Sequence, residues 1–244
     1  MTTTGRTAIV TGSSRGIGKA VAERLAADGL AVVVNYAGNA AEADKTVAAI
    51  AATGGRAIAV QADVADELAV AALFDTAERE FGGVDVVVNS AGIMVLGPVA
   101  AFKLEDLDRM HRINVRGTFV VNQQAARRMR SGGAIINVST SAERQALPGY
   151  AAYAASKGAV EAIGLILARE LRGRDITVNT VGPGPTATDL FLDGKDEATI
   201  DRLAKLNPLE RLGTPADIAE VVSFLAGRTR WINGQVIYAN GGMN

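Results

Sequence analysis

Short apolar runs alternate with longer segments of helical period along nearly the whole of this 244-residue chain. The runs at 7–11 and 30–35 are apolar or β-branched almost throughout, which is typical of strands covered on both faces. Strands that alternate with helices form right-handed crossovers and therefore lie parallel in one sheet. The sequence predicts an α/β fold, a doubly wound parallel sheet of about seven strands with helices on both faces.

The predicted elements also indicate where function should be found. Strands are predicted at 7–11, 30–35, 56–61, 84–89, 134–139, 177–181 and 235–238. Helices are predicted at 17–28, 41–52, 66–81, 106–129, 151–171, 199–206 and 216–226. Ligands of such sheets bind beyond the carboxyl ends of the strands, so we expect the functional residues in the loops that follow them.

Composition excludes several classes of function. Lys and Arg number 25 against 26 Asp and Glu, a net charge of −1, which argues against binding to nucleic acid. The chain has no cysteine and a single histidine, His111, so cysteine chemistry, a Cys-type zinc site and a multi-histidine metal site are excluded. It begins without a secretory signal, and no uninterrupted apolar run approaches about 18 residues. We therefore expect a cytoplasmic protein without a membrane span or a metal.

Three glycines, Gly12, Gly16 and Gly18, lie between the first predicted strand and the first predicted helix. Glycine permits a sharp turn and lets a phosphate approach the backbone closely. The following helix presents unpaired N–H groups and a positive dipole end to an anion. The spacing is that of neither a Walker loop nor the usual G-x-G-x-x-G turn, because position 14 is serine. A dinucleotide site is nevertheless favoured by this strand–turn–helix context.

This glycine turn resembles that of the short-chain dehydrogenase/reductase family, and further motifs of that family follow in order. They are Asn89-Ser-Ala-Gly92, Asn114, Tyr153-Ala-Ala-Ser-Lys157, Asn179 and Pro183-Gly-Pro-Thr-Ala-Thr188. The resemblance extends over residues 5–242 and is strongest to 3-oxoacyl acyl-carrier-protein reductases and ketoreductases. It implies one Rossmann-type domain over residues 1–244, with 189–207 as a substrate lid, and assembly into a homotetramer.

The resemblance also implies a bound nicotinamide dinucleotide. An acid after the second strand would bond the 2′-hydroxyl of NAD, but that position holds Tyr36, and Arg15 could pair with a 2′-phosphate. NADP(H) is therefore predicted, with NAD(H) as the alternative. The predicted cofactor-binding residues are Gly12, Ser14, Arg15, Gly16, Ile17, Gly18, Asn35, Tyr36, Asp63, Val64, Asn89, Ala91, Gly92, Tyr153, Lys157, Pro183, Gly184, Thr186 and Thr188.

Tyr153 and Lys157 are four residues apart in a predicted helix and therefore share one face. A free tyrosine has a pKa of about 10, and a nearby ammonium lowers it because it favours the phenolate. Lowering that pKa to about 7 requires about 4 kcal/mol of differential stabilisation. We expect Lys157, helped by the positive charge of an oxidised nicotinamide, to supply it, so that Tyr153 exchanges a proton with the substrate oxygen.

Two further catalytic residues follow from the resemblance. The family has a serine thirteen residues before the tyrosine, and that position is Thr140 here. Thr140 keeps the hydroxyl and is assigned the role of holding the substrate oxygen, with Ser141 as the alternative. Side chains alternate along a strand, so Ser139 and Ser141 should face away from Thr140 if the strand continues. Asn114 lies inside a predicted helix, although asparagine is a poor helix former. In the family this residue loosens the helix and holds a water that relays protons to the lysine.

The walls of the substrate pocket are predicted from segments 93–96, 143–150 and 189–207. The side chains of Glu143, Arg144 and Gln145 could add polar selectivity or simply be solvated. Apolar residues suggest a pocket for a ketone or its alcohol: Met94, Leu96, Leu190 and Phe191.

The motifs together predict an NADPH-dependent carbonyl reductase for a ketone or 3-oxoacyl substrate, with Tyr153 as the general acid. The same residues in reverse would make an NAD(P)-dependent alcohol or sugar dehydrogenase. A dinucleotide-sensing protein without turnover is a further alternative, because a fold does not fix a function.

Overall fold

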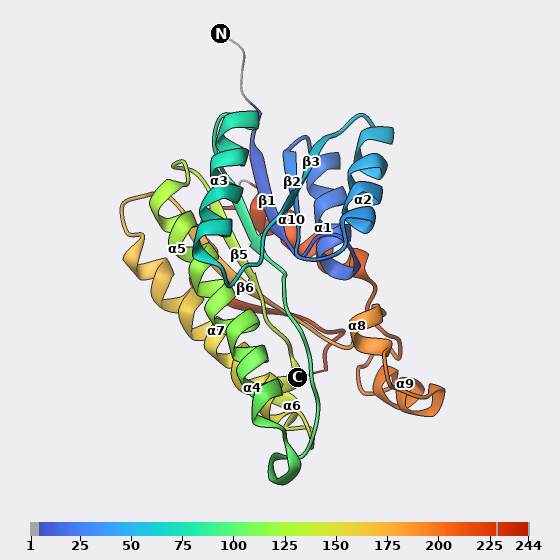
Figure 1. Cartoon of the computed structure of the whole chain (residues 1–244). Helices are drawn as coiled ribbons and strands as arrows, with labels where there is room; N and C mark the ends of the chain where they lie inside the picture. The colour runs from blue at the N-terminus through green and yellow to red at the C-terminus, as the bar shows by residue number, and fades with distance from the viewer. Residues whose placement is uncertain (1–4, 228, 244) are drawn as a thin grey trace.

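The computed structural model describes residues 5–227 and 229–243, so residues 1–4, 228 and 244 of the predicted domain lie outside the described residues. Its seven strands form one parallel sheet in the order β3-β2-β1-β4-β5-β6-β7, which confirms the predicted fold class (Figure 1). The strands are β1 (Thr7–Thr11), β2 (Ala31–Tyr36), β3 (Arg56–Gln61), β4 (Val86–Asn89), β5 (Ala134–Val138), β6 (Thr177–Pro183) and β7 (Val236–Ala239).

Helices cover both faces of the sheet (Figure 1). One face carries α1 (Gly16–Ala27), α2 (Ala40–Ala52) and α10 (Pro215–Ala226), and the other carries α3 (Glu67–Phe81), α5 (Thr118–Arg128) and α7 (Ala151–Glu170). The remaining helical segments are η1 (Val99–Ala101), α4 (Leu104–Met110), η2 (His111–Gly117), α6 (Ala142–Gln145), α8 (Asp189–Leu192) and α9 (Glu197–Ala204).

Two apolar layers hold the helices to the sheet. The first joins Val10, Val32 and Ile136 of the strands to Leu25 of α1 and Leu225 of α10. The second packs Phe74 and other apolar residues of α3, α5 and α7 against the opposite strand faces. Each fully buried Leu, Ile or Phe contributes about 1.5–3 kcal/mol, so the strands are rigid supports for the loops at their ends.

The structure differs from the expected elements at three places. The edge strands β3 and β7 are only partly buried, because a helix layer cannot cover the outer side of a sheet edge. The helix expected at 106–129 is interrupted by η2, one wide π turn that carries Asn114. The short helices α6 and α8 and the single turn η1 were not expected, since three or four residues show no periodic pattern.

Helix α7 has the length and mean hydropathy, 1.3, that would also suit a membrane-crossing helix. A core helix passes the same test, and α7 packs against β5 and β6 through Val160, Gly164 and Leu167. The finding is therefore weak evidence for a membrane segment.

Candidate active site

The glycine turn after β1 has a backbone that only glycine fits. Gly12 and Gly16 have φ angles of +62° and +56°, a region that side chains disfavour. A Cβ on Gly12 would lie 2.7 Å from the Cα of Ala91, and one on Gly18 would lie 2.4 Å from the Gly12 carbonyl oxygen. The turn, the loop after β4 and the first turn of α1 therefore touch backbone to backbone.

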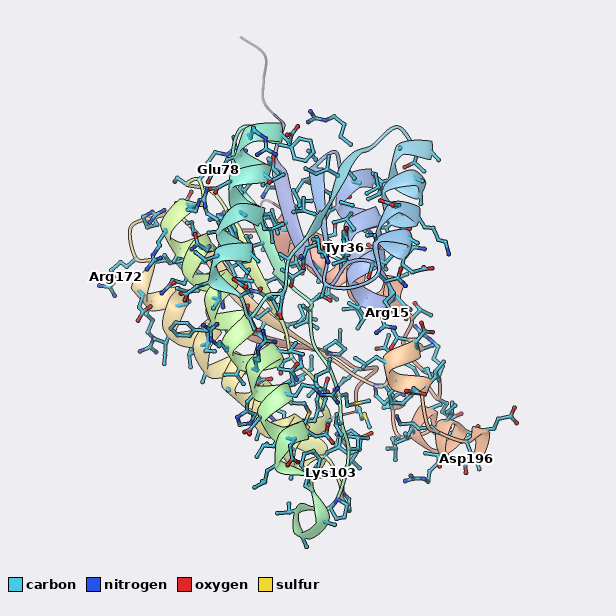
Figure 2. The ribbon with its side chains drawn as sticks, in the orientation of Figure 1. Arg15, Tyr36, Glu78, Lys103, Arg172 and Asp196 are labelled. Carbon is cyan, nitrogen blue, oxygen red and sulfur yellow. The ribbon has the colours of Figure 1, made fainter. Side chains whose placement is uncertain are left out.

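The start of α1 is open to an anion. Arg15 occupies the N-cap position without a side-chain cap, and no acidic residue lies in the first turn. The unpaired N–H groups and the positive end of the helix dipole thus face the cavity. Arg15 is exposed and lies next to α8 at the mouth of the cavity (Figure 2).

Asn35 holds the turn in place from β2. Its Oδ1 accepts a hydrogen bond from the Gly12 N–H at 3.2 Å, and its Nδ2 donates to the Ala62 carbonyl at 3.0 Å. Asn35 thus joins the loops after β1, β2 and β3. Tyr36 is partly exposed and lines the cavity, where it is followed by Ala37, Gly38 and Asn39.

The segment after β3 is fixed by the π turn. Arg112 donates to Asp63 at 2.7 Å, and the pKa of Asp63 is lowered, because the Ala65 N–H and the Arg112 guanidinium outweigh the effect of burial. Val64 packs so closely on η2 that a Cβ on Gly117 would lie 2.6 Å from its Cγ2. Both Asp63 and Val64 line the cavity.

Asn89 is the one predicted cofactor residue that does not line the cavity. Its side chain is buried and donates to Asn122 at 2.8 Å and Asn137 at 2.9 Å. Asn89 therefore anchors β4 to β5 and α5, and the neighbouring Ser90, Ala91 and Gly92 form the wall. Sequence reasoning missed Ser90, which has no signal of its own beyond its place in the motif.

Tyr153 and Lys157 line the cavity and are buried on the face of α7 turned toward β5. Lys157 Nζ is 6.0 Å from the centroid of the Tyr153 ring and donates to the Val138 carbonyl oxygen at 2.8 Å. Thr140 forms a hydrogen bond with the Tyr153 side chain, and the Ala142 N–H donates to the Thr140 hydroxyl at 3.2 Å. The structure thus brings the three predicted catalytic side chains together.

Thr140, and not its serine neighbours, meets Tyr153. The Ser139 hydroxyl donates instead to Glu161 at 2.8 Å, while Ser141 lines the cavity. Both Ser139 and Thr140 therefore reach α7, contrary to the expectation of opposite faces. The reason is that the regular strand ends at Val138, after which strict alternation no longer applies.

The pKa values of Tyr153 and Lys157 are shifted in opposite directions, and the pKa of Tyr153 rises where a fall was expected. Burial raises the pKa of Tyr153 to about 12, although the Thr140 hydrogen bond acts to lower it. Burial lowers the pKa of Lys157 to about 8. The ammonium of Lys157 is directed at a carbonyl and not at the phenol, so the cost of burying a phenolate dominates. Tyr153 is consequently protonated at neutral pH.

Asn114 is fully buried behind the cavity. Its amide accepts from the N–H of Ile93 and donates to the carbonyl of Ile93, both at 2.9 Å, and donates to Ser156 at 3.0 Å. A Cβ on Gly92 would lie 3.2 Å from Asn114 Oδ1 and 3.4 Å from Lys157 Nζ. The absence of a side chain at Gly92 thus allows the Asn114 amide and the Lys157 ammonium to lie close to the backbone of this loop.

The loop after β6 closes the cavity. Pro183, Gly184, Thr186 and Thr188 line it, and the Thr188 hydroxyl caps α8 by accepting from the Phe191 N–H at 3.3 Å. The helices α8 and α9 project from the body of the sheet on this side (Figure 1).

The cavity has a volume of about 680 Å³ and runs from the loop after β2 to α9. Met94, Leu190 and Phe191 line it as expected, whereas Leu96 lines only an adjoining groove. Several lining side chains carried no sequence signal, because tertiary packing alone brings them to the cavity. They include Glu42 and Met243, whereas Leu203 belongs to the predicted wall segment 189–207.

The residues present fit a dinucleotide. A phosphate would be held by backbone N–H groups of a turn whose glycines exclude any Cβ, at an uncapped helix start. Eighteen of the 19 predicted cofactor residues line this one cavity. Among the described residues, no group of three or more His, Cys, Asp or Glu side chains could hold a metal ion.

Comparison with known proteins agrees with this picture. The family model described as enoyl-(acyl carrier protein) reductase matches residues 12–244. A short-chain type dehydrogenase/reductase of Picea abies is 45% identical over 98% of this chain and 92% of its own length. An NADPH-dependent aldehyde reductase-like protein of Arabidopsis thaliana is 44% identical over 98% of this chain and 94% of its own. The crystal structure of a short-chain dehydrogenase from Burkholderia cenocepacia in complex with NADP is 40% identical, with a TM-score of 0.92 and 98% of both chains covered.

Proposed function

The chain belongs to the short-chain dehydrogenase/reductase family and is an NAD(P)-dependent oxidoreductase acting on C=O and CH–OH groups, and from that premise we propose that it is an NADPH-dependent reductase of uncharged ketones and aldehydes. The observation that carries the proposal is the buried group of Tyr153, Lys157 and Thr140 in the cavity that the glycine turn opens. A protonated, buried phenol suits the donation of a proton to a carbonyl oxygen.

The preference for NADPH rests on the end of β2. No acid occupies the position of Tyr36. The two acidic side chains that line the nucleotide end are both paired, Glu42 with Lys45 at 2.6 Å and Asp63 with Arg112 at 2.7 Å. The guanidinium of Arg15 has no hydrogen bond or ion pair within residues 5–227 and 229–243, so it is available to a 2′-phosphate. NADP-bound and NADPH-dependent relatives support the same choice, and NAD(H) is the alternative.

In the proposed reaction the bound cofactor supplies the hydride that reaches the carbonyl carbon. Tyr153 gives its proton to the carbonyl oxygen, so hydride and proton together convert C=O to CH–OH. Thr140 holds that oxygen, and Lys157 holds the nicotinamide ribose and lowers the cost of the phenolate that forms. Asn114 completes the path by which the proton is replaced. Run in reverse, the same residues oxidise an alcohol.

The substrate end of the cavity is proposed to take an apolar compound. Its walls include the side chains of Leu147, Tyr150, Phe191, Leu203 and Met243. The charged lining residues are Arg15, Glu42 and Asp63 at the nucleotide end, Lys157 in the catalytic group and Asp189 at the start of α8. Glu143 and Arg144 turn away toward β7 and do not line the cavity, so they offer a substrate no charge.

The test is the consumption of NADPH and of NADH in the presence of a panel of aromatic and aliphatic ketones, aldehydes and the corresponding carboxylated compounds. We expect turnover with uncharged carbonyls, and a higher kcat/KM with NADPH than with NADH. Equal or higher kcat/KM with NADH would overturn the cofactor assignment, and the absence of any turnover would favour a sensor without catalysis.

We further propose a cytoplasmic homotetramer formed by one continuous domain, with 189–207 as its lid. Leu165 and Ile166 of α7 and Phe119 of α5 are about half exposed, which is unusual for large apolar side chains on neighbouring helices and suits contact with a second copy. Light scattering of the purified chain measures the assembly directly.

A further inference from the structure

A cluster of polar side chains lies directly behind the catalytic group. It comprises Ser139 after β5, Glu143 and Arg144 of α6, Glu161 of α7 and Tyr238 of β7. Figure 1 shows α6 beside the start of α7 and near the C-terminal end of the chain. These residues do not contact the substrate end of the cavity, apart from Ser139, and the proposed reaction does not use them.

Glu161 lies one helical turn beyond Lys157 on the same face of α7. It accepts a hydrogen bond from Ser139 at 2.8 Å, and Ser139 also lies 3.3 Å from the carbonyl oxygen of Lys157. The peptide that joins Val138 to Ser139 carries the carbonyl that accepts the Lys157 ammonium. Glu161 therefore holds the side chain of Ser139. The two chain neighbours of Ser139 are Val138, which accepts the hydrogen bond from Lys157, and Thr140.

The carboxyl group of Glu143 lies against α7 one turn before Glu161, with its Oε2 3.6 Å from the Cβ position of Gly158, and a hydrogen bond to Glu143 is among the causes that raise the pKa of Glu161. Two carboxyl groups can share a hydrogen bond only when one of them keeps its proton. The Tyr238 hydroxyl donates to Glu143 at 2.9 Å. The Tyr238 ring packs on Gly182 so closely that a Cβ there would lie 2.6 Å from its Cδ1. The pair thus joins α6 to α7 and to β7, next to the backbone of Thr140.

We propose that Glu161 is a positioning residue that, through one proton shared with Glu143, locks α6 onto α7 and fixes the backbone of Thr140 and Lys157. The consequence for catalysis rests on the proposed function, whereas the lock itself does not. Because α6 begins the wall formed by Gln145, Leu147 and Tyr150, release of the lock loosens the substrate end of the cavity.

The charges around Glu161 give the lock a pH dependence. Burial and the neighbouring Glu143 raise the pKa of Glu161 to about 7, while the Ser139 hydrogen bond and Arg144 act to lower it. Tyr238 is the other titratable group in contact with Glu143. The ammonium of Lys157, one turn before Glu161, is directed at the Val138 carbonyl instead. The folded chain keeps the Glu161 proton above pH 4.5, the ordinary pKa of the carboxyl group. The stability that this group contributes is therefore fully present below pH 4.5 and is lost as the pH rises to about 7.

The Glu161→Gln variant separates the lock from general stability. Its amide accepts from Ser139 and donates to Glu143 at every pH, so we expect its Tm to stay level where that of the wild type falls by about 3 °C between pH 5 and pH 7.5. Glu170→Gln, an exposed carboxylate at the end of the same helix, should follow the wild-type curve. Parallel curves for wild type and Glu161→Gln would overturn the lock, and this measurement needs neither substrate nor cofactor.

Steady-state ketone reduction tests the effect on the catalytic group. We expect Glu161→Ala to lower kcat about tenfold through misplacement of Thr140 and Lys157, and Glu161→Gln to restore it to within about twofold. The decline in wild-type kcat/KM as pH rises through about 7 should be absent from Glu161→Gln. Equal kcat in wild type and Glu161→Ala, or the same decline in all variants, would contradict the positioning role.

Discussion

The nucleotide end and the substrate end of the cavity are built in different ways. At the nucleotide end, backbone groups after β1 and β4 meet at distances that leave no room for a Cβ, as at Gly12 and Gly18. At the substrate end, side chains from α8, α9 and the C-terminal residues close around open space, as Phe191, Leu203 and Met243 do. Backbone contacts tolerate almost no change in residue, whereas side-chain walls tolerate much. One end is therefore suited to fixing the proposed cofactor, while the other can vary with the substrate.

Lys157 stands where the two ends meet, and its removal should have the largest effect. Lys157→Ala eliminates the ammonium beside Tyr153 and the proposed contact to the nicotinamide ribose, so we expect kcat to fall about 100-fold and the affinity for NADPH to weaken as well. Steady-state rates and a fluorescence titration with NADPH measure the two effects. A kcat within about threefold of the wild type would remove Lys157 from the mechanism.

Gly12→Ala tests the backbone contact at the nucleotide end. The new methyl group would lie 2.7 Å from Ala91 Cα at a φ of +62°, so we expect NADPH affinity to fall more than about tenfold. Gly29→Ala is the matched control, because Gly29 also has a positive φ, +90°, but nothing lies within 4 Å of its Cβ position. If both variants bind NADPH as the wild type does, the close approach has no role in binding.

Arg15→Gln tests which dinucleotide the nucleotide end prefers. Loss of a charge-assisted contact to a 2′-phosphate should lower the ratio of kcat/KM with NADPH to that with NADH by about tenfold. Lys19→Gln, one turn further along α1 and 3.9 Å from Glu23, should leave the ratio unchanged. An unchanged ratio in Arg15→Gln would show that the 2′-phosphate is read elsewhere.

Phe191→Ala should have the smallest effect, because it alters a side-chain wall. We expect KM for an apolar ketone to rise about fivefold while the Kd for NADPH stays the same. Leu209→Ala, a 61% exposed residue outside the cavity lining, serves as the control. A change in NADPH affinity without a change in KM would reverse the assignment of this wall to the substrate end.

The sequence predicts the nucleotide end better than the substrate end for a physical reason. The turn at Gly12, Gly16 and Gly18 is local, so spacing and the conformational freedom of glycine are sufficient to place it. The same holds for Tyr153 and Lys157, since helical geometry alone puts them on one face. The predicted strands agree with the structure because apolar runs report burial, apart from the half-covered edge strands.

What the sequence did not predict depends on contacts between distant segments. Met243 reaches the cavity from the last residues of the chain, and Glu161 meets Ser139 across the gap between α7 and β5. The ammonium of Lys157, one helical turn away, is expected to lower the pKa of Tyr153. Burial raises that pKa instead, and burial is a property of the whole fold. The side-chain role of Asn89, which donates to Asn122 and Asn137, likewise has no local signal in the sequence.

The claim that Tyr153 donates the proton is tested most directly by a single turnover of ketone with prebound NADPH, in the wild type and in Tyr153→Phe. The variant lacks only the hydroxyl, so the account predicts unchanged NADPH affinity and a rate of NADPH oxidation at least about 100-fold lower. Oxidation of NADPH at the wild-type rate in Tyr153→Phe would contradict it.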